Sequence, residues 1–133
     1  MKLNIDYSQL DRYAARMREA AAGSAREMMK GLLAETADRV TGETKRNTPV
    51  ATGALRAAWN AGGVGESGGY LKAAISNGME YATHVERGHR TRNGKWVQGR
   101  HMLRNAMEAA QRGIQRDFDA RLAKWAKEEG LAT

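Results

Sequence analysis

Three histidines and one glutamate carry the side chains that most often bind divalent metal ions, and they lie close together in the sequence. They are His84, Glu86, His89 and His101. Their spacing is not the His-Glu-x-x-His pattern of zinc proteases, and a zinc deaminase would need a pair of cysteines, which this chain lacks. We therefore interpret these residues as part of a surface loop and predict no metal site.

No other group of residues predicts catalysis. None of the serines lies in a Gly-x-Ser-x-Gly turn, and the pair Glu80 and Glu86 is one of many that 15 acidic residues produce. Residues 62–65 are superficially similar to a dinucleotide-binding loop, but an apparent strand follows them instead of a helix. The sequence therefore predicts no catalytic residue and no cofactor, and we expect that the protein is not an enzyme.

A basic segment is more informative. No acidic residue occurs between Glu86 and Glu108, and most of the formal net charge of +7 lies in this interval. Two partners fit such a segment: an acidic protein surface, or the phosphates of a nucleic acid, with the tryptophan stacked on a base. A solvated loop without a partner is the third interpretation. The segment contains Arg87, His89, Arg90, Arg92, Lys95, Trp96, Arg100 and Arg104.

The composition limits the size of the hydrophobic core. Leu, Ile, Val and Phe together supply 18 of the 133 residues. So small a share with a high net charge is typical of disorder, but the periodicity of the apolar residues favours a folded chain. We expect one domain, residues 1–133, whose core is completed by copies of itself or by a partner. The sequence has no membrane-spanning apolar run and no apolar signal-peptide core at residues 1–6, so we expect synthesis in a cytoplasm.

Two long helices must position the basic segment. Apolar residues recur every three or four positions from Leu10 to Val40, and Pro49 ends this first helix. Gly23-Ser24 is the expected place for a kink or a break. The same periodicity resumes at His101 and stops at Gly130. This last helix would be about 42 Å long, so we expect part of its apolar stripe to meet something outside the chain.

Short strands complete the predicted fold. Alternation predicts strands over residues 2–6, 55–59 and 71–75, with a flexible, glycine-rich loop at 61–69 that is too rich in glycine to pack. Residues 79–86 stay ambiguous, and Asn93-Gly94 predicts a tight turn with residues 95–97 as the return strand. The fold class is α+β, with long N-terminal and C-terminal helices on a small antiparallel sheet. We expect the loops 62–69 and 87–99 to be mobile until they dock.

Three short motifs, in this order, resemble a known family. Residues 48–56 read Thr-Pro-Val-Ala-Thr-Gly-Ala-Leu-Arg, residues 81–88 read Tyr-Ala-Thr-His-Val-Glu-Arg-Gly, and residues 99–106 read Gly-Arg-His-Met-Leu-Arg-Asn-Ala. This combination resembles the phage tail-completion or head–tail joining family, the gene-product-ten-like minor tail components. The chain departs from the pattern at Ala51 and at Gly99-Arg100-His101, where the family has a proline-containing start of the last helix. The matching residues are Pro49, Thr52, Gly53, Leu55, Arg56, Tyr81, Ala82, Val85, Glu86, Gly88 and Met102.

The resemblance implies a structural protein of the neck or tail of a phage or prophage virion. Its subunits would form a ring, expected to be a hexamer, between the head connector or adaptor protein and the major tail tube protein or tail terminator. The genomic DNA would pass through the ring and touch it transiently. The motif residues have structural roles in this interpretation: Pro49 ends the helix, Tyr81 and Val85 pack on the sheet, and Gly88 lets the chain reverse. The alternative is a nucleic-acid-binding module that uses the basic loop 87–104.

Overall fold

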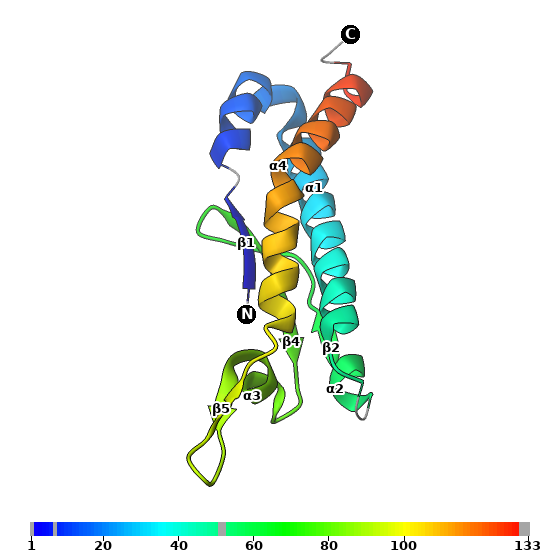
Figure 1. Cartoon of the computed structure of the whole chain (residues 1–133). Coiled ribbons are helices and arrows are strands. Elements are labelled where there is room, and N and C mark those ends of the chain that lie inside the picture. The colour runs from blue at the N-terminus through cyan, green and yellow to red at the C-terminus, as the bar shows by residue number, and fades with distance from the viewer. Residues whose placement is uncertain (1, 7, 51–52, 131–133) are drawn as a thin grey trace.

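The computed structural model describes residues 2–6, 8–50 and 53–130, and side chains from residue 23 onward within these ranges. Its two long helices lie side by side along the length of the molecule, and short strands and helices fill one side and one end (Figure 1). The fold is therefore α+β, as predicted. In chain order the elements are β1 (Lys2–Asp6), α1 (Ser8–Asn47), α2 (Ala54–Ala57), β2 (Trp59–Ala61), β3 (Gly65–Ser67), β4 (Tyr70–Asn77), α3 (Ala82–Arg87), β5 (Gly88–Arg90), β6 (Trp96–Gln98) and α4 (Met102–Glu128).

From residue 23 onward, helix α1 buries the stripe that the sequence predicts, while the stripe's side chains from Leu10 to Ala21 lie outside the described residues. Ala25, Met28, Leu32 and Val40 are all at most 8% exposed. The helix is continuous, yet Figure 1 shows that it changes direction within its blue N-terminal third. Of the two outcomes predicted near Gly23-Ser24, the structure shows a kink, and the helix does not break. The stripe also contains threonines, whose buried hydroxyls donate to the carbonyl four residues earlier: Thr36, Thr41, Thr44 and Thr48.

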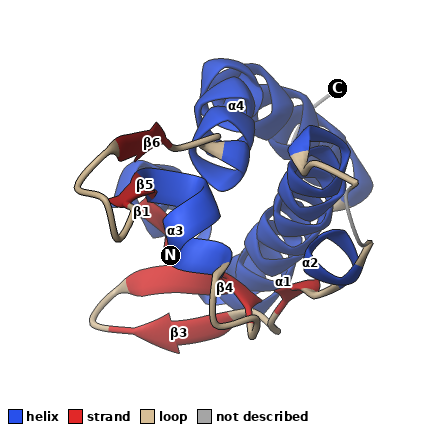
Figure 2. Cartoon of the chain, turned by 60° about the horizontal axis from the view of Figure 1, so that its bottom comes forward, coloured by secondary structure: helices blue, strands red, loops and turns tan. Residues whose placement is uncertain are grey.

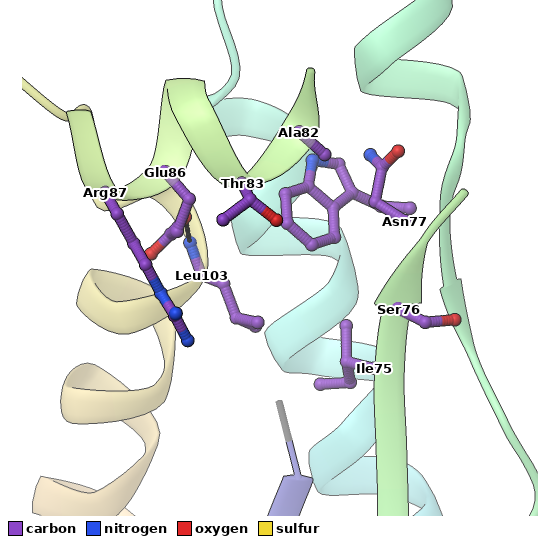
Figure 3. Close-up of a pocket in the computed structure, with 9 residues that line it drawn as sticks. Ile75, Ser76, Asn77, Ala82, Thr83, Glu86, Arg87 and Leu103 are labelled. Atoms are coloured by element: carbon purple, nitrogen blue, oxygen red, sulfur yellow. Dashed lines mark hydrogen bonds between the residues drawn. The ribbon is translucent and has the colours of Figure 1, made fainter. Parts of the chain in front are cut away.

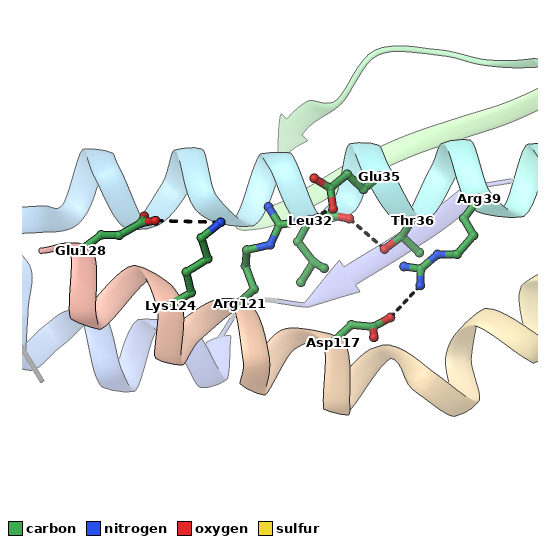
Figure 4. A network of polar contacts seen from close by, with 8 residues as sticks. All are labelled: Leu32, Glu35, Thr36, Arg39, Asp117, Arg121, Lys124 and Glu128. Atoms are coloured by element: carbon green, nitrogen blue, oxygen red, sulfur yellow. Dashed lines mark hydrogen bonds and ion pairs between the residues drawn. The ribbon is translucent and has the colours of Figure 1, made fainter. Parts of the chain in front are cut away.

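Helix α4 packs antiparallel against α1 and ends where the sequence predicts. Its 27 residues stop at Glu128, and Gly130 follows with a φ of 72°, a conformation that favours glycine. Ion pairs cross between the two helices, from Arg39 to Asp117 at 3.0 Å and from Arg121 to Glu35 (Figure 4). Such solvent-exposed pairs contribute little stability each, so they chiefly fix the register of the helices.

The sheet is built around β4. Strand β1 pairs antiparallel with one edge of β4, from Lys2 opposite Ala74 to Asp6 opposite Tyr70. Strands β2 and β3 pair with the same strand along its length, and Figure 2 shows β3 and β4 as a layer beside the helices. Leu71, Ala73 and Ile75 point from β4 into the core, which confirms the predicted strand over residues 71–75.

Two sequence predictions about the sheet are wrong in part. Residues 54–57 form the short helix α2, and only Trp59 of the predicted strand 55–59 is extended. Leu55 and Trp59 are four residues apart, a spacing that puts both on one face of a helix as well as of a strand. The glycine-rich segment does pack, because Val64 is half-buried against the core and residues 65–67 pair with β4.

The core divides into two clusters along the molecule. One lies between the middle of α1, the strand β4 and the end of α4, and it includes Met29, Leu33 and Trp125. The other lies at the end that carries α3 and the start of α4. Among the helices described, none is long and apolar enough to cross a membrane.

Candidate functional site

The second core cluster brings the three sequence motifs together. Leu55 from the first motif, Ala82 from the second and Met102 from the third are buried in contact with the same group of apolar side chains. Three segments that are separated in the sequence by residues 57–80 and 89–98 therefore share one packing site. The motif residues form a structural junction from which the basic segment projects.

Glu86 connects the second motif to the third. Its side chain is 5% exposed, and its Oε1 and Oε2 accept hydrogen bonds from the backbone amides of Leu103 at 2.9 Å and Arg104 at 3.1 Å. These amides belong to the first turn of α4, where a helix has no internal acceptors and where its dipole favours a negative charge. Glu86 is thus the N-terminal cap of a helix that begins after an intervening hairpin, and the interpretation of Glu86 as a surface-loop residue is wrong.

The residues directly before α4 provide no side-chain cap of their own. His101 occupies the position before α4 with a φ of 48°, and its side chain makes no capping hydrogen bond. Its backbone amide instead donates to the carbonyl of Glu86 at 3.0 Å, and the amide of Arg100 donates to the carbonyl of Val85 at 2.7 Å. The start of α4 is therefore held by both the backbone and the side chain of α3.

Two glycines allow the backbone segments at the base of the hairpin to approach each other closely. Gly88 has a φ of 87°, and a Cβ there would lie 2.6 Å from the carbonyl oxygen of Val97. A Cβ on Gly99 would lie 2.5 Å from both the carbonyl carbon of Arg87 and the carbonyl oxygen of Glu86. Real Cβ atoms do not approach this closely, so only glycine fits at either position. The prediction that Gly88 lets the chain reverse is confirmed.

The hairpin formed by β5 and β6 carries the basic segment. Gly88 pairs with Gln98 and Arg90 with Trp96, with Asn93-Gly94 in the predicted turn. Figure 1 shows this hairpin projecting from the end of the molecule, below α3 and the start of α4. We call residues 88–98 the basic hairpin from here on.

The cations on and beside the basic hairpin face solvent. Arg104 lies 3.8 Å from Glu108, and the guanidinium of Arg90 donates to the carbonyl of Gly94. The other four basic side chains of this segment, Arg87, Arg92, Lys95 and Arg100, form no ion pair with a carboxylate of the described residues. The exposed basic residues are Arg87, Arg90, Arg92, Lys95, Arg100 and Arg104.

The basic hairpin also exposes apolar surface. Trp96 is 57% exposed and Val97 is 41% exposed. One edge of the Trp96 ring covers Gly88, since a Cβ on that glycine would lie 2.7 Å from Cζ2 of the ring. The indole Nε1 donates to Oε1 of Gln98 at 3.3 Å. Trp96 thus contacts the hairpin through Gly88 and Gln98, and more than half of its surface is exposed to solvent.

The histidines of this region do not converge with Glu86. The rings of His84 and His89 stack with centroids 5.3 Å apart, and the buried Nδ1 of His89 has no hydrogen-bond partner. Glu86 points instead at α4. Across residues 23–50 and 53–130 no three metal-binding side chains are grouped closely enough to hold an ion.

A cavity of about 220 Å³ lies beside the capped helix start (Figure 3). Two of its polar residues are hydrogen-bonded within the fold: Glu86 accepts from α4, and Asn77 donates to the carbonyl of Leu55 and accepts from the amide of Met79. Trp59, which also lines the cavity, donates its indole N–H to Oγ1 of Thr48 at 2.9 Å. Ser76 and Thr83 supply the hydroxyls of the lining, and the Glu86 carboxylate accepts from the backbone amides of α4.

The remaining motif residues have structural positions. Gly53 has a φ of 73° before α2, while Pro49 and Arg56 are half-buried. Val85 packs against the second core cluster, but Tyr81 is 39% exposed, so the prediction that Tyr81 packs on the sheet is wrong. Thr52 lies outside the described residues.

A comparison with known families identifies the chain. A family model described as "Bacteriophage HK97-gp10, putative tail-component" matches residues 11–88, which is more than half of the sequence. The chain belongs to the HK97 gp10-like family. No curated protein and no solved structure matches it. Membership assigns the protein a structural role in a phage tail and a place in the virion.

The HK97 gp10-like match ends at the first residue of the basic hairpin. It covers the first two motifs, α1 from residue 11 onward, and the sheet strands β2 to β4. The third motif and α4 lie beyond it, yet Met102 and Leu103 pack into the same cluster as Leu55 and Ala82. The structure therefore joins the matched segment and the C-terminal helix through one shared core.

Proposed function

We propose that this HK97 gp10-like protein is the tail-completion subunit that joins the head connector to the tail tube. It acts by protein–protein binding alone. Copies of the chain form a ring, with a hexamer as the family expectation, between the head connector or adaptor and the major tail protein or tail terminator. The genomic DNA passes through the ring and touches it transiently. The chain is made in the host cytoplasm and ends in the neck of the virion.

The observation that carries this proposal is the junction of the three motifs. The family match accounts for residues 11–88, and Met102 at the start of α4 is buried in the same core cluster as Leu55 and Ala82. The buried cap at the start of α4 and the apolar junction of the three motifs support a role in holding parts together.

The incompletely buried helix α4 supports assembly into a ring. Ile114, Phe118 and Leu122 lie on its apolar stripe, yet each is only half-buried. A neighbouring copy that covered these side chains would remove further apolar surface from water, which is the main driving force of association. The small core predicted from composition is thus compatible with a subunit completed by its neighbours.

Labelling of purified particles tests the position in the virion. Gold-conjugated antibodies against this chain should mark the junction of head and tail in electron micrographs. Label along the tube or at the distal tip of the tail would contradict the proposal. Particles from a strain that lacks the gene provide the control for antibody specificity.

A second candidate function is nucleic-acid binding through residues 87–104. The six exposed cations at the hairpin and the start of α4 favour it. Contacts to phosphates release counterions, so binding of labelled duplex or single-stranded DNA would weaken steeply as salt increases. Micromolar binding with such a slope would support this function, and absence of binding at 150 mM salt would remove it.

A further inference from the structure

We propose that the basic hairpin is a preformed docking element whose Trp96 enters an apolar groove with an acidic rim on a different virion protein. This inference rests on the proposed joining function and specifies the chemistry of one of its partners. The binding partner of the hairpin is a protein of different sequence and not a second copy of this chain.

The charge of the hairpin specifies an acidic partner. Arg92 and Lys95 flank its turn, and Arg87 and Arg100 flank its base, all with exposed side chains. The chain provides no acidic residue from position 87 to position 107 to neutralise them. A surface with complementary negative charge would accelerate the encounter and fix the orientation of the hairpin.

The described surface of this chain does not offer that acidic counterpart. Its carboxylates are largely occupied within the subunit, for example Glu35 by Arg121, Asp117 by Arg39 and Glu128 by Lys124. Asp38 on α1 and Glu80 before α3 lie on separate elements and do not make a patch. The charge pattern therefore favours a partner of different sequence over a second copy.

The exposed apolar residues favour a protein over DNA. Trp96 and Val97 expose apolar surface on a hairpin that also carries exposed cations, and tryptophan and arginine are among the residues most enriched where binding energy concentrates in protein interfaces. Contacts to the phosphates of a duplex would leave the indole uncovered, since duplex bases are stacked and paired. A groove with apolar walls would bury it.

Contacts at the base of the basic hairpin fix the position of Trp96 and the neighbouring cations. The backbones approach each other closely at Gly88 and Gly99, and the Trp96 ring rests on Gly88. Glu86 and the carbonyl of Val85 fix the return of the chain into α4. A surface ordered before binding loses less conformational entropy on docking, so a hairpin of this size can supply useful affinity.

Site-specific cross-linking in assembled particles tests the proposal. Trp96 is replaced by the photo-reactive residue p-benzoylphenylalanine, particles are irradiated, and the cross-linked peptides are identified by mass spectrometry. We expect a cross-link to a peptide of a different virion protein that contains Asp or Glu near apolar residues. A cross-link only to a second copy of this chain, only to DNA, or to nothing would overturn the proposal.

Assembly measurements with matched variants separate the inference from the proposed function. Trp96→Ala and the double charge reversal Arg92→Glu/Lys95→Glu should each lower the yield of joined particles at least tenfold. Tyr70→Ala removes an aromatic side chain of comparable exposure, 43%, from β4 and should leave the yield unchanged. Unchanged circular dichroism and melting temperature confirm that each variant folds. Normal yields with the hairpin variants, in a phage that needs the gene for joining, would overturn the docking proposal alone.

Discussion

The carboxylate of Glu86 lies 2.9 Å from the amide nitrogen of Leu103, across a hairpin that separates these residues by 17 positions. This contact ties α3 to the first turn of α4 and closes the base of the basic hairpin. The capped helix therefore depends on a residue of the second motif. Loss of the cap should affect both stability and the position of the hairpin.

Replacement of Glu86 should destabilise the fold. Glu86→Ala leaves two amides of α4 without acceptors and should lower the free energy of unfolding by about 1–3 kcal/mol. Glu86→Gln keeps one acceptor oxygen but no charge, so we expect a smaller loss. Urea denaturation followed by circular dichroism measures both. Glu108→Gln, on the exposed side of the same helix, is the control and should change stability by less than about 0.5 kcal/mol. Equal effects of Glu86→Ala and the control would contradict the role of the cap.

Side chains added at the hairpin base should be poorly tolerated. Gly88→Ala and Gly99→Ala place a Cβ 2.6 Å or less from backbone atoms, and Gly88 also has a positive φ. We expect each to cost about 2 kcal/mol or more in the free energy of unfolding, measured by urea denaturation. Gly63→Ala is the matched control, because a Cβ there meets no atom within 4 Å and its φ is not positive. A Gly99→Ala variant as stable as Gly63→Ala would show that the close approach is absent.

The hydrogen bond from Trp59 to Thr48 should contribute more to stability than the hydrogen bonds that the threonines within α1 make to its backbone carbonyls. Thr48→Val removes the acceptor of a buried indole N–H and should cost about 1–3 kcal/mol. Thr36→Val removes only a hydroxyl that donates to the carbonyl of Leu32 and should cost less. Thermal or urea unfolding of the two variants compares them. If a double-mutant cycle of Thr48→Val with Trp59→Phe gives no coupling energy, the bond does not contribute.

Limited proteolysis should cleave the basic hairpin first. Arg92 and Lys95 flank an exposed turn, and few contacts hold this turn to the rest of the chain. Trypsin should cut there before it cuts the basic residues of α4, and assembly into particles should protect the site. Mass spectrometry of early fragments gives the order of cleavage. Cleavage within α4 before cleavage at Arg92 or Lys95 in the free protein would contradict this prediction.

The helices and the central strand could be predicted because each buries one face. The stripe from Leu103 to Trp125 has the period of a helix, and alternation from Leu71 to Ile75 has the period of a strand packed on one side. Leu55 and Trp59 satisfy both periods, so their spacing could not separate the helix α2 from a strand. Alanines at positions 54, 57 and 58, which favour helices, were the available signal.

The junction at Glu86 could not be predicted from local patterns. A capping residue is ordinarily sought within four residues of the helix start, whereas Glu86 acts from another helix. The one indication in the sequence is negative: Gly99, Arg100 and His101 offer no side chain typical of a cap before a strongly periodic helix. That deficit implies a remote cap, but only the three-dimensional arrangement shows which carboxylate provides it.

The most direct test of the joining function is assembly in the absence of this protein. A phage or induced prophage that lacks the gene should produce DNA-filled heads and separate tails, counted by electron microscopy, and few infectious particles. Addition of the purified protein to a mixture of these heads and tails should restore joined, infectious particles. Complete particles without the protein, or tails that fail to form at all, would contradict the account.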